Sequence, residues 1–319
     1  MDTAHNHQRT ERQPDRVRNS CAQSSHSRGR GGRQVVRDIF EHAVKALEQS
    51  GNDNSRFDAA QLFEKAFGVQ YELADKSAPA DEKAAGLFNG YIEKRQSGYP
   101  LQYILGEWEF YGLTVKVGEG VLIPRQDTET LVETVIRKSR TQRPVIIDLC
   151  SGSGCIALAL ERELSPSAVY AVELSEQAAE YLKQNIELNT SKVSLTVGDC
   201  LDKAVIDSLP KADIIVCNPP YLTGDDMRSL QTEVTHEPQS ALYGGEDGLD
   251  FYRDITRAYK TRLKHNGMLA FEVGHTQAEE VMEILIQAGL EDVRAYKDYC
   301  GIRRAVVGFY TEKQNVRVY

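Results

Sequence analysis

Residues 145–154 read VIIDLCSGSG, and residues 155–160 continue as CIALAL. A short β-branched run that ends in an acid and a glycine-rich turn, and then passes into an apolar helical stretch, is typical of the first unit of a doubly wound α/β fold. Similar runs recur at 168–173, 193–198, 212–217 and 267–273, and strand-like segments at 291–296 and 303–310 close the chain. Helical stretches are expected near 154–163, 175–188, 249–264 and 276–288. This alternation predicts a Rossmann-like parallel sheet covered by helices on both faces.

The glycine-rich loop after the first run is a candidate ligand site. Gly152 and Gly154 allow the backbone to approach a ligand closely, and the start of the next helix suits a carboxylate or a phosphate. The loop alone fits a dinucleotide or S-adenosylmethionine, and a plain strand-to-helix turn is the alternative without a function. Glu173 ends the second run, where nucleotide-binding folds place an acid for ribose hydroxyls. Asp199 follows the third run, where a short polar residue suits an adenine amino group.

The most specific signal is the segment Asn218-Pro219-Pro220-Tyr221, which follows the apolar run 212–217. Ligands of open α/β sheets bind at this carboxyl edge of the strands. Two successive prolines remove two N–H donors and restrict the backbone, which fixes the directions of the Asn218 side chain and of the following carbonyl. The segment therefore predicts a rigid pair of hydrogen-bond acceptors.

Such a pair matches a planar nitrogen, in an amide or an exocyclic amine, that carries two N–H donors. These nitrogens are weak nucleophiles because their lone pair is delocalised. If Asn218 Oδ1 and the Pro219 carbonyl accept both N–H bonds, the nitrogen is held in line with a methyl donor, and Tyr221 flanks the planar group. Positioning then supplies most of the rate, and no strong base needs to act beforehand. A turn without function is the alternative, and the glycine loop in the same chain disfavours it.

The 319 residues suffice for one large and one small domain. Residues 1–34 contain seven Arg and few apolar residues, which predicts a disordered tail. Apolar residues at helical spacing predict an all-helical domain over 35–98, which serves for packing or for holding a macromolecular partner. A linker is expected over 99–123, with a β-hairpin from Tyr103 to Val117. The α/β domain is expected over 124–312, with Asp127 or Thr128 capping its first helix.

Composition excludes several classes of function. The formal net charge of −9 argues against a protein that binds naked nucleic acid mainly through its phosphates. No apolar run approaches the roughly 20 residues that span a bilayer, and the start of the chain has no apolar core of a secretory signal. The six cysteines lack Cys-X-X-Cys spacing, so neither a metal site nor a disulfide framework is predicted, and reduced thiols indicate the cytoplasm.

Together, the glycine loop and the Asn-Pro-Pro-Tyr segment resemble class I methyltransferases that act on planar nitrogen, namely the adenine-N6, guanine-N2 and glutamine-N5 enzymes. Residues 100–106 (PLQYILG) and 122–129 (LIPRQDTE) are similar to the release factor glutamine N5-methyltransferases in particular, as are 236–238 and 244–249. The similarity extends from about residue 35 to residue 310. It implies S-adenosylmethionine as cofactor and a helical domain that docks a peptide chain release factor. The expected product is a methylated glutamine in the Gly-Gly-Gln loop of that factor.

The resemblance also implies roles for particular residues. The substrate glutamine would be held by Asn218, Pro219, Pro220 and Tyr221. The cofactor would be bound by Asp148, Cys150, Ser151, Gly152, Ser153, Gly154, Glu173, Asp199, Cys200 and Asn218, with Phe110 as an aromatic wall. Arg125 is expected to be structural or close to the cofactor.

Three positions depart from the family's commoner residues. Cys150 replaces a glycine, Gln126 replaces a proline and Glu173 replaces an aspartate. None of these changes removes a required chemical group. Because Cys150 has a Cβ atom, its backbone is expected to avoid strongly positive φ.

The main alternative is an amino-methyltransferase that acts on adenine or guanine in nucleic acid. Such an enzyme requires a basic groove or a target-recognition insertion. The chain after residue 34 is more acidic than the whole, because the tail holds seven Arg against three acids, and no insertion of that size is present. A non-enzymatic partner of a larger methyltransferase is disfavoured, since the loop, the acid and the acceptor pair all occur in one chain.

Overall fold

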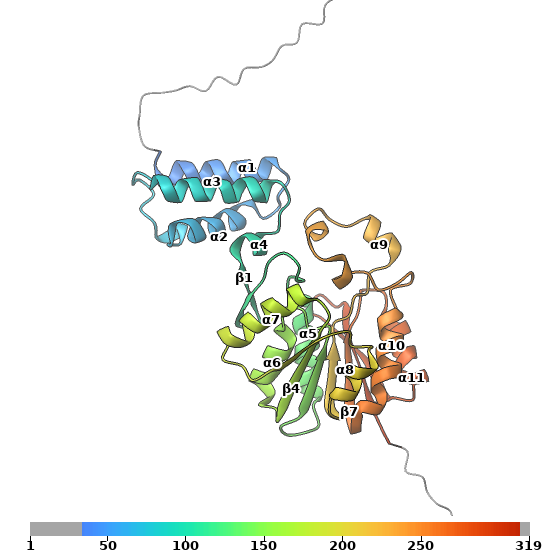
Figure 1. The fold of residues 1–319 in the computed structure, drawn as a ribbon. Helices are drawn as coiled ribbons and strands as arrows, with labels where there is room; N and C mark the ends of the chain where they lie inside the picture. Colours follow the sequence, from blue (N-terminus) through green and yellow to red (C-terminus); the bar gives the residue numbers. More distant parts are fainter. Residues whose placement is uncertain (1–33, 313–319) are drawn as a thin grey trace, which may run out of the picture.

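The computed structural model describes residues 34–312. Except for Gln34, the tail that the sequence predicts to be disordered, residues 1–34, lies outside the described residues. Figure 1 shows a small helical unit beside a larger α/β body, with a short connection between them. The helical unit contains α1 (Val36–Gln49), α2 (Ser55–Phe67), the 3-10 turn η1 (Tyr71–Leu73) and α3 (Glu82–Gln96). Within the described range no helix is long and apolar enough to cross a membrane.

The helical unit has its own aromatic core. Phe40, Phe63 and Phe88, one from each helix, are fully buried. The Phe40 ring stacks on Tyr71 with 3.5 Å between centroids, and Phe63 meets Phe88 edge to face. Gly68 adopts φ +69° and ends α2, a conformation that favours glycine. The apolar spacing seen in the sequence therefore builds a compact three-helix unit.

The connection differs from the expected hairpin at its start. Residues 101–105 form the short helix α4 (Leu101–Leu105), and the strands are β1 (Glu107–Phe110) and β2 (Leu113–Lys116). The expectation that the hairpin begins at Tyr103 is therefore wrong. Pro100 stands at the N-cap of α4, and Gly106 with φ +76° ends it, so two local signals outweigh the β propensity of the residues between them.

The α/β body is built on one mixed sheet of seven strands. The strands are β3 (Val145–Leu149), β4 (Ala168–Glu173), β5 (Ser194–Val197), β6 (Ala212–Cys217), β7 (Leu263–Glu272), β8 (Glu291–Lys297) and β9 (Arg303–Tyr310). Their order is β5-β4-β3-β6-β7-β9-β8, and β9 runs antiparallel to both of its neighbours. The predicted doubly wound α/β class is confirmed, and the last of these strands in the chain, β9, is antiparallel within it.

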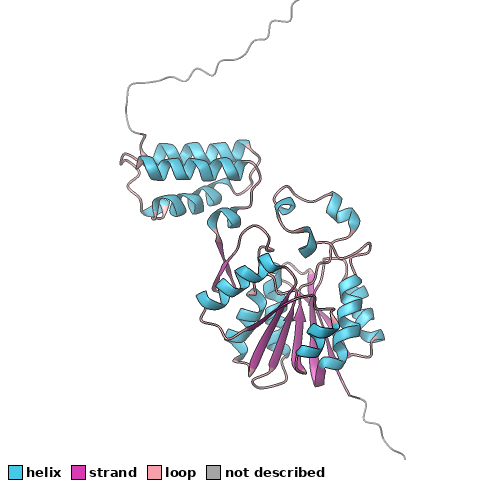
Figure 2. Ribbon diagram, in the orientation of Figure 1, coloured by secondary structure: helices cyan, strands magenta, loops and turns pink. Residues whose placement is uncertain are grey.

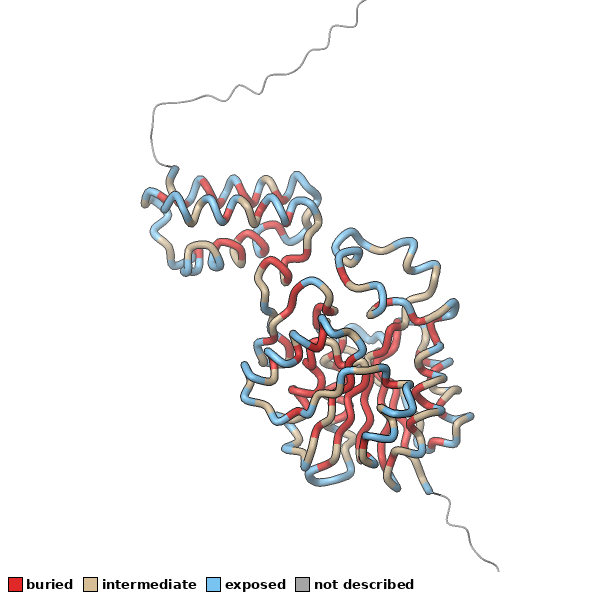
Figure 3. Tube along the Cα trace, viewed as in Figure 1, coloured by how far each residue is buried: buried red, intermediate tan, exposed pale blue. Residues whose placement is uncertain are grey.

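Helices cover both faces of this sheet (Figure 2). Side chains along each strand alternate between two cores, as shown by Ile146 and Ile147 on β3. One core includes residues of α5 (Gln126–Lys138), α6 (Cys155–Leu164) and α7 (Glu176–Leu188), and the other includes residues of α10 (Asp250–Tyr259) and α11 (Ala278–Gln287). Figure 3 shows the resulting buried interior of the sheet.

Two element boundaries, the end of α10 and the start of β7, differ from those expected from the sequence. The helix expected at 249–264 ends at Tyr259, and β7 begins at Leu263 rather than at residue 267. A 3-10 turn, η4 (Lys260–Arg262), separates them, and Leu263 pairs with Ala212 before the register shifts. Five short helical segments complete the body, among them α8 (Lys203–Ser208), α9 (Gly224–Arg228), η2 (Val234–His236) and η3 (Gln239–Ala241).

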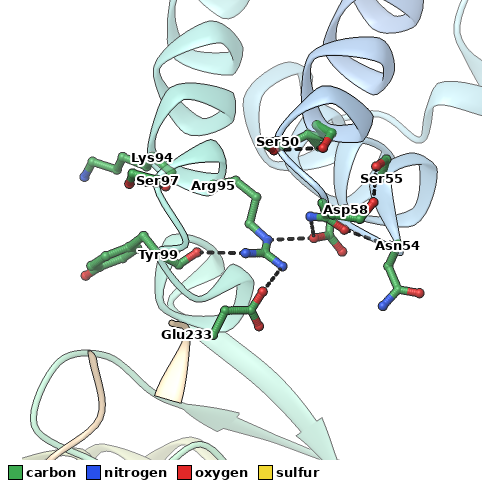
Figure 4. A network of polar contacts seen from close by, with 11 residues as sticks. Ser50, Asn54, Ser55, Asp58, Lys94, Arg95, Ser97, Tyr99 and Glu233 are labelled. Atoms are coloured by element: carbon green, nitrogen blue, oxygen red, sulfur yellow. Dashed lines mark hydrogen bonds and ion pairs between the residues drawn. The ribbon is translucent and has the colours of Figure 1, made fainter. Parts of the chain in front are cut away.

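A buried arginine joins the helical unit to the α/β body (Figure 4). Arg95 of α3 donates from Nε to Asp58 Oδ2 at 2.6 Å, and from Nη2 to Glu233 Oε1 at 2.5 Å. The Arg95 and Asp58 side chains are only 8% and 4% exposed, whereas Glu233 is 48% exposed. Glu233 belongs to the segment between β6 and α10, so one guanidinium connects three parts of the chain.

We expect Arg95→Met to destabilise the protein far more than Glu233→Gln. The first change leaves the buried Asp58 carboxylate without its cation, which costs roughly 3–5 kcal/mol in comparable pairs. The second removes a half-exposed partner, worth about 1 kcal/mol or less. Chemical denaturation followed by circular dichroism measures both free energies of unfolding. Equal losses in the two variants would show that Asp58 does not depend on Arg95 for its charge compensation.

Candidate active site

The glycine loop turns sharply between β3 and α6. Cys150, Gly152 and Gly154 have φ of +55°, +53° and +80°. The expectation that Cys150 avoids positive φ is wrong. Ser151 fixes the turn from both sides, because its N–H donates to the Val172 carbonyl at 3.1 Å and its hydroxyl donates to the Asp148 carbonyl at 2.8 Å. These contacts offset a backbone strain on the order of 1–3 kcal/mol.

The two loop glycines have different roles. A Cβ atom on Gly154 would lie 2.8 Å from Leu182 Cγ, so this glycine lets α6 pack closely on α7. A Cβ atom on Gly152 would meet nothing within 4 Å, and this residue lines a cavity. The loop therefore combines close helix packing with an open face toward a ligand.

That cavity, called here the loop cavity, has a volume of about 220 Å³. It is lined at the carboxyl ends of the strands by most of the expected cofactor residues, namely Cys150, Ser151, Gly152, Ser153, Glu173, Asp199, Cys200 and Asn218. Asp148 lies beneath the loop and Gly154 caps α6, so neither reaches the surface of the cavity. Phe110 is not brought here, because its ring is buried in the core under the hairpin and borders a separate hollow.

The two strand-end acids of the loop cavity differ in their surroundings. Glu173 is buried, and its carboxylate accepts N–H bonds from Gly152 at 2.7 Å and from Ser175 at 2.8 Å. It therefore orients the glycine loop as well as facing the cavity. Asp199 is exposed and accepts one N–H bond from Leu201 at 2.8 Å. Both carboxylates keep lone pairs for ligand hydroxyl or amino groups.

Asp148 is a buried acid with no hydrogen bond to either carboxylate oxygen. Burial raises its pKa to about 8, and the nearby Ser151 hydroxyl and Ala157 amide offset that effect only in part. A buried carboxyl group without a partner is costly for folding. Its place under the glycine loop points to a functional role for this acid.

The charges around the loop cavity favour a cationic ligand over a phosphate. Among the described residues that line it, Arg125 is the only cation, and that side chain is paired with Glu237. Glu173 and Asp199 face the cavity, and their two carboxylates would repel a pyrophosphate. The alternative of a dinucleotide is thereby disfavoured. The sulfonium and ammonium groups of S-adenosylmethionine fit these residues.

Three apolar side chains complete the wall of the loop cavity, and none of them was expected from the sequence. Leu174 follows the acid of β4 and is 62% exposed, and Ile156 and Phe251 also line the cavity. An exposed leucine beside a strand-end acid supplies a flat apolar contact for a planar base. Its position directly after Glu173 is the only feature of the sequence that could have identified Leu174 as a wall residue.

Asn218 stands between the loop cavity and a second one. The second cavity, called here the clamp cavity, has a volume of about 330 Å³ and is lined by Arg125, Asn218, Tyr221 and Glu272 among others. Asn218 and Arg125 line both cavities. The Asn218 Nδ2 group donates to Thr128 Oγ1 at 3.4 Å, which leaves Oδ1 as an acceptor. Groups bound in the two cavities would therefore meet at Asn218.

The rest of the Asn-Pro-Pro-Tyr segment is held tightly. Pro219 and Pro220 are buried, and Gln277 Nε2 donates to the Tyr221 carbonyl at 2.9 Å. Pro220 lines the loop cavity and Tyr221 lines the clamp cavity, while the buried Pro219 lines neither. The turn is close enough to Gly244 that a Cβ atom there would lie 2.6 Å from the Pro220 carbonyl oxygen. Packing from a distant loop thus fixes the segment.

The side chains of Arg125 and Thr128 contact residues of the site and, within the described range, form no capping hydrogen bond at the start of α5. Arg125 itself is the N-cap residue of α5, so the expectation that Asp127 or Thr128 caps this helix is wrong. Arg125 pairs with Glu237, a buried acid whose other oxygen accepts the Ile123 N–H at 3.2 Å. Thr128 lies in the first turn of α5, is 2% exposed and contacts Asn218.

Comparisons with known proteins agree with this arrangement. The family model "Methyltransferase small domain" matches residues 125–248, and the "PrmC N-terminal domain" model matches residues 38–106. A release factor glutamine methyltransferase of Fusobacterium nucleatum is 38% identical over 279 residues, which are 85% of this chain and 77% of the relative. One from Geobacter sulfurreducens is 37% identical and covers 86% of this chain and 96% of its own length. One from Moorella thermoacetica is 36% identical over its full length.

Solved structures show the same fold. The hMettl16 catalytic domain, in complex with the MAT2A 3′UTR hairpin 1, has a TM-score of 0.54 and 16% identity. The alignment covers 86% of this chain and 92% of that structure. The likeness is one of fold.

We expect Glu173→Gln to weaken the binding of S-adenosylmethionine by about ten- to a hundredfold, the range for a lost hydrogen bond to a charged group. A glutamine has one acceptor oxygen, so it cannot serve both backbone amides and a ribose. Isothermal titration calorimetry measures the affinity, and Glu176→Gln, an exposed change three residues away, is the control. An affinity equal to that of the wild type would remove Glu173 from the cofactor site.

Proposed function

The chain belongs to the release factor glutamine methyltransferase family, and we propose on that premise that it methylates the side-chain amide nitrogen (N5) of a release factor glutamine. The methyl donor is S-adenosylmethionine, and the glutamine is the one in the Gly-Gly-Gln loop. The observation that carries the proposal is the position of Asn218 at the junction of the loop cavity and the clamp cavity.

The loop cavity would hold the cofactor. Backbone groups of 150–153, the Glu173 and Asp199 carboxylates and the exposed Leu174 provide polar and apolar contacts on its walls. When bound there, S-adenosylmethionine supplies an electrophilic methyl group on a cationic sulfur. The Glu173 and Asp199 carboxylates stabilise positive charge in a partly enclosed cavity, where electrostatic interactions are stronger than in bulk water.

The clamp cavity would hold the glutamine side chain. The Thr128 contact leaves Asn218 Oδ1 free to accept one N–H of the substrate amide, and the Pro219 carbonyl accepts the other. Tyr221 flanks the amide plane. With both N–H bonds held by these acceptors, the nitrogen would face the methyl donor. The new N–C bond would form as the S–C bond breaks, with loss of a neutral thioether, and the nitrogen would release one proton to solvent. That proton becomes acidic as the nitrogen leaves conjugation, so alignment supplies most of the rate.

The macromolecular part of the substrate would dock on the helical unit. We propose that residues 35–98 form the docking domain, 99–123 the linker and 124–312 the methyltransferase domain. Arg95 ties the helical unit to the segment that lines the clamp cavity, which supports one continuous binding surface. We further propose a cytoplasmic location and no stable binding of free nucleic acid, in keeping with the net charge of −9.

The substrate class is tested directly by transfer of labelled methyl groups. The purified protein is incubated with S-adenosylmethionine and, separately, with release factor, DNA and RNA. We expect label only in the release factor, at the Gly-Gly-Gln glutamine, as located by mass spectrometry. Label in DNA or RNA at an adenine or guanine amine would support the nucleic-acid alternative instead.

Asn218→Ala should lower methyl transfer by roughly two or more orders of magnitude, the scale for losing one positioned polar group in a preorganised site. Cofactor binding should fall little, because the glycine loop and Glu173 remain. Asn218→Asp keeps an acceptor and should retain more activity than the alanine variant. Single-turnover methylation at saturating cofactor is the measurement. Equal rates for Asn218→Ala and wild type would rule out the clamp.

A further inference from the structure

Glu272 is an acid of the clamp cavity that the mechanism above does not use. It is the last residue of β7, and the pairing of Cys217 with Phe271 places it beside Asn218 at the carboxyl edge of the sheet. The residue is 2% exposed, and within residues 34–312 its Oε2 atom has no hydrogen-bond partner. An ionisable group so placed is costly for folding and lines the cavity next to Asn218.

Thr128 lies between Glu272 and Asn218. Its Oγ1 atom accepts a hydrogen bond from the Asn218 Nδ2 group at 3.4 Å, and the Thr128 hydroxyl lowers the pKa of the Glu272 carboxyl, as a nearby donor does. A hydroxyl has one proton to donate and two lone pairs. A carboxylate at 272 takes the proton, so Oγ1 presents a lone pair toward Asn218.

The direction of this hydrogen bond determines which end of the Asn218 amide faces the substrate. While Oγ1 accepts from Nδ2, the Oδ1 atom is turned toward the substrate nitrogen. If the Thr128 proton is free, the hydroxyl is able to donate to Oδ1, and the amide turns over. Its NH₂ group then meets the NH₂ group of the substrate, where two donors repel each other.

We propose that Glu272 is a positioning residue that acts through Thr128 to keep the Asn218 amide oxygen directed at the substrate nitrogen. The inference rests on the proposed function, because it concerns the acceptor that holds the glutamine. It assigns a use to a buried carboxyl group that otherwise only destabilises the fold.

The charges around Glu272 decide when it is ionised. Burial raises its pKa to about 7, Asp127 raises it further, and Thr128, Arg304 and Arg125 lower it. Arg304 is itself bonded to Asp127 at 2.7 Å and to Asp298 at 3.4 Å, and Arg125 to Glu237. Tyr221 and Tyr252 nearby stay neutral, because burial raises the pKa of each phenol. The fraction of Glu272 that is ionised, and with it the proposed orientation of the Asn218 amide through Thr128, therefore increases as the pH rises through neutrality.

The test compares Glu272→Met with the wild type in single-turnover methylation of release factor at saturating cofactor. Methionine fills the space of the acid without a charge, so we expect the melting temperature to be unchanged or higher. The rate should fall by roughly ten- to a hundredfold, as expected for a misplaced contact, with little change in KM for release factor. Glu280→Gln, an exposed change on α11, is the matched control. Glu272→Leu, which likewise has no acceptor for the Thr128 proton, replaces Glu272→Met if the latter does not fold.

Two further measurements separate positioning from a structural role. The wild-type rate should rise with pH through the range around 7, and the Glu272→Met rate should lack that rise. In an Asn218→Ala background the Glu272→Met change should have little additional effect, because no amide remains to be oriented. Additive effects, a wild-type rate in Glu272→Met, or an unchanged pH profile would overturn the proposal. Absence of methylation in the wild type itself would instead refute the proposed function.

Discussion

Hydrogen bonding between three neighbouring parallel strands sets the geometry on which the site depends. Leu149 at the end of β3 pairs with Cys217 at the end of β6, and Cys217 pairs with Phe271 near the end of β7. The residues that follow these three positions are therefore in register at one edge of the sheet. They are the start of the glycine loop, the acceptor Asn218 and the buried Glu272. A one-residue slip in either ladder would turn these side chains to the opposite face.

Two buried acids at this edge of the sheet destabilise the folded state. Asp148 and Glu272 are buried, each has at least one carboxylate oxygen without a hydrogen bond, and burial raises the pKa of both. Neither contributes to folding in the way that the paired Asp58 does with Arg95. Groups that break the rule of polar satisfaction cluster at functional sites, and here both lie at the carboxyl ends of central strands. The interior of the sheet between them is apolar.

The strands, the order of the motifs and the glycine loop were predictable from sequence because each depends on neighbours within a few residues. The conformation of Cys150 and the contact of Thr128 were not, since each depends on contacts with distant parts of the chain. The helix α4 was missed although Pro100 and Gly106 mark its two ends in the sequence. Cys150 tolerates a positive φ only because Ser151 is bound to Val172 on the adjacent strand. The expected wall residue Phe110 belongs to the core, and Leu174 stands at the cavity instead. Glu272, like Glu173, is an acid at the end of an apolar strand. No glycine-rich loop precedes it closely in the sequence, so nothing there marked it as a site residue.

The segment between β6 and α10 contacts both the helical unit and the wall of the clamp cavity. Glu233 is bonded to Arg95 of the helical unit, its neighbour Val234 lines the clamp cavity, and Glu237 is bonded to Arg125. An ion pair with a half-exposed partner contributes little to the free energy of folding. The main effect of the Arg95 to Glu233 bond is therefore to fix where the segment that contains Glu233 lies relative to the helical unit. Docking of the substrate on the helical unit, as proposed above, would act on Glu233 through Arg95. Glu233 and Val234 are adjacent and Glu237 follows three residues later, so the residue that contacts Arg95 and the wall of the clamp cavity lie in one short stretch of chain. Under that proposal the helical unit contributes to alignment at Asn218 as well as to the affinity for the substrate.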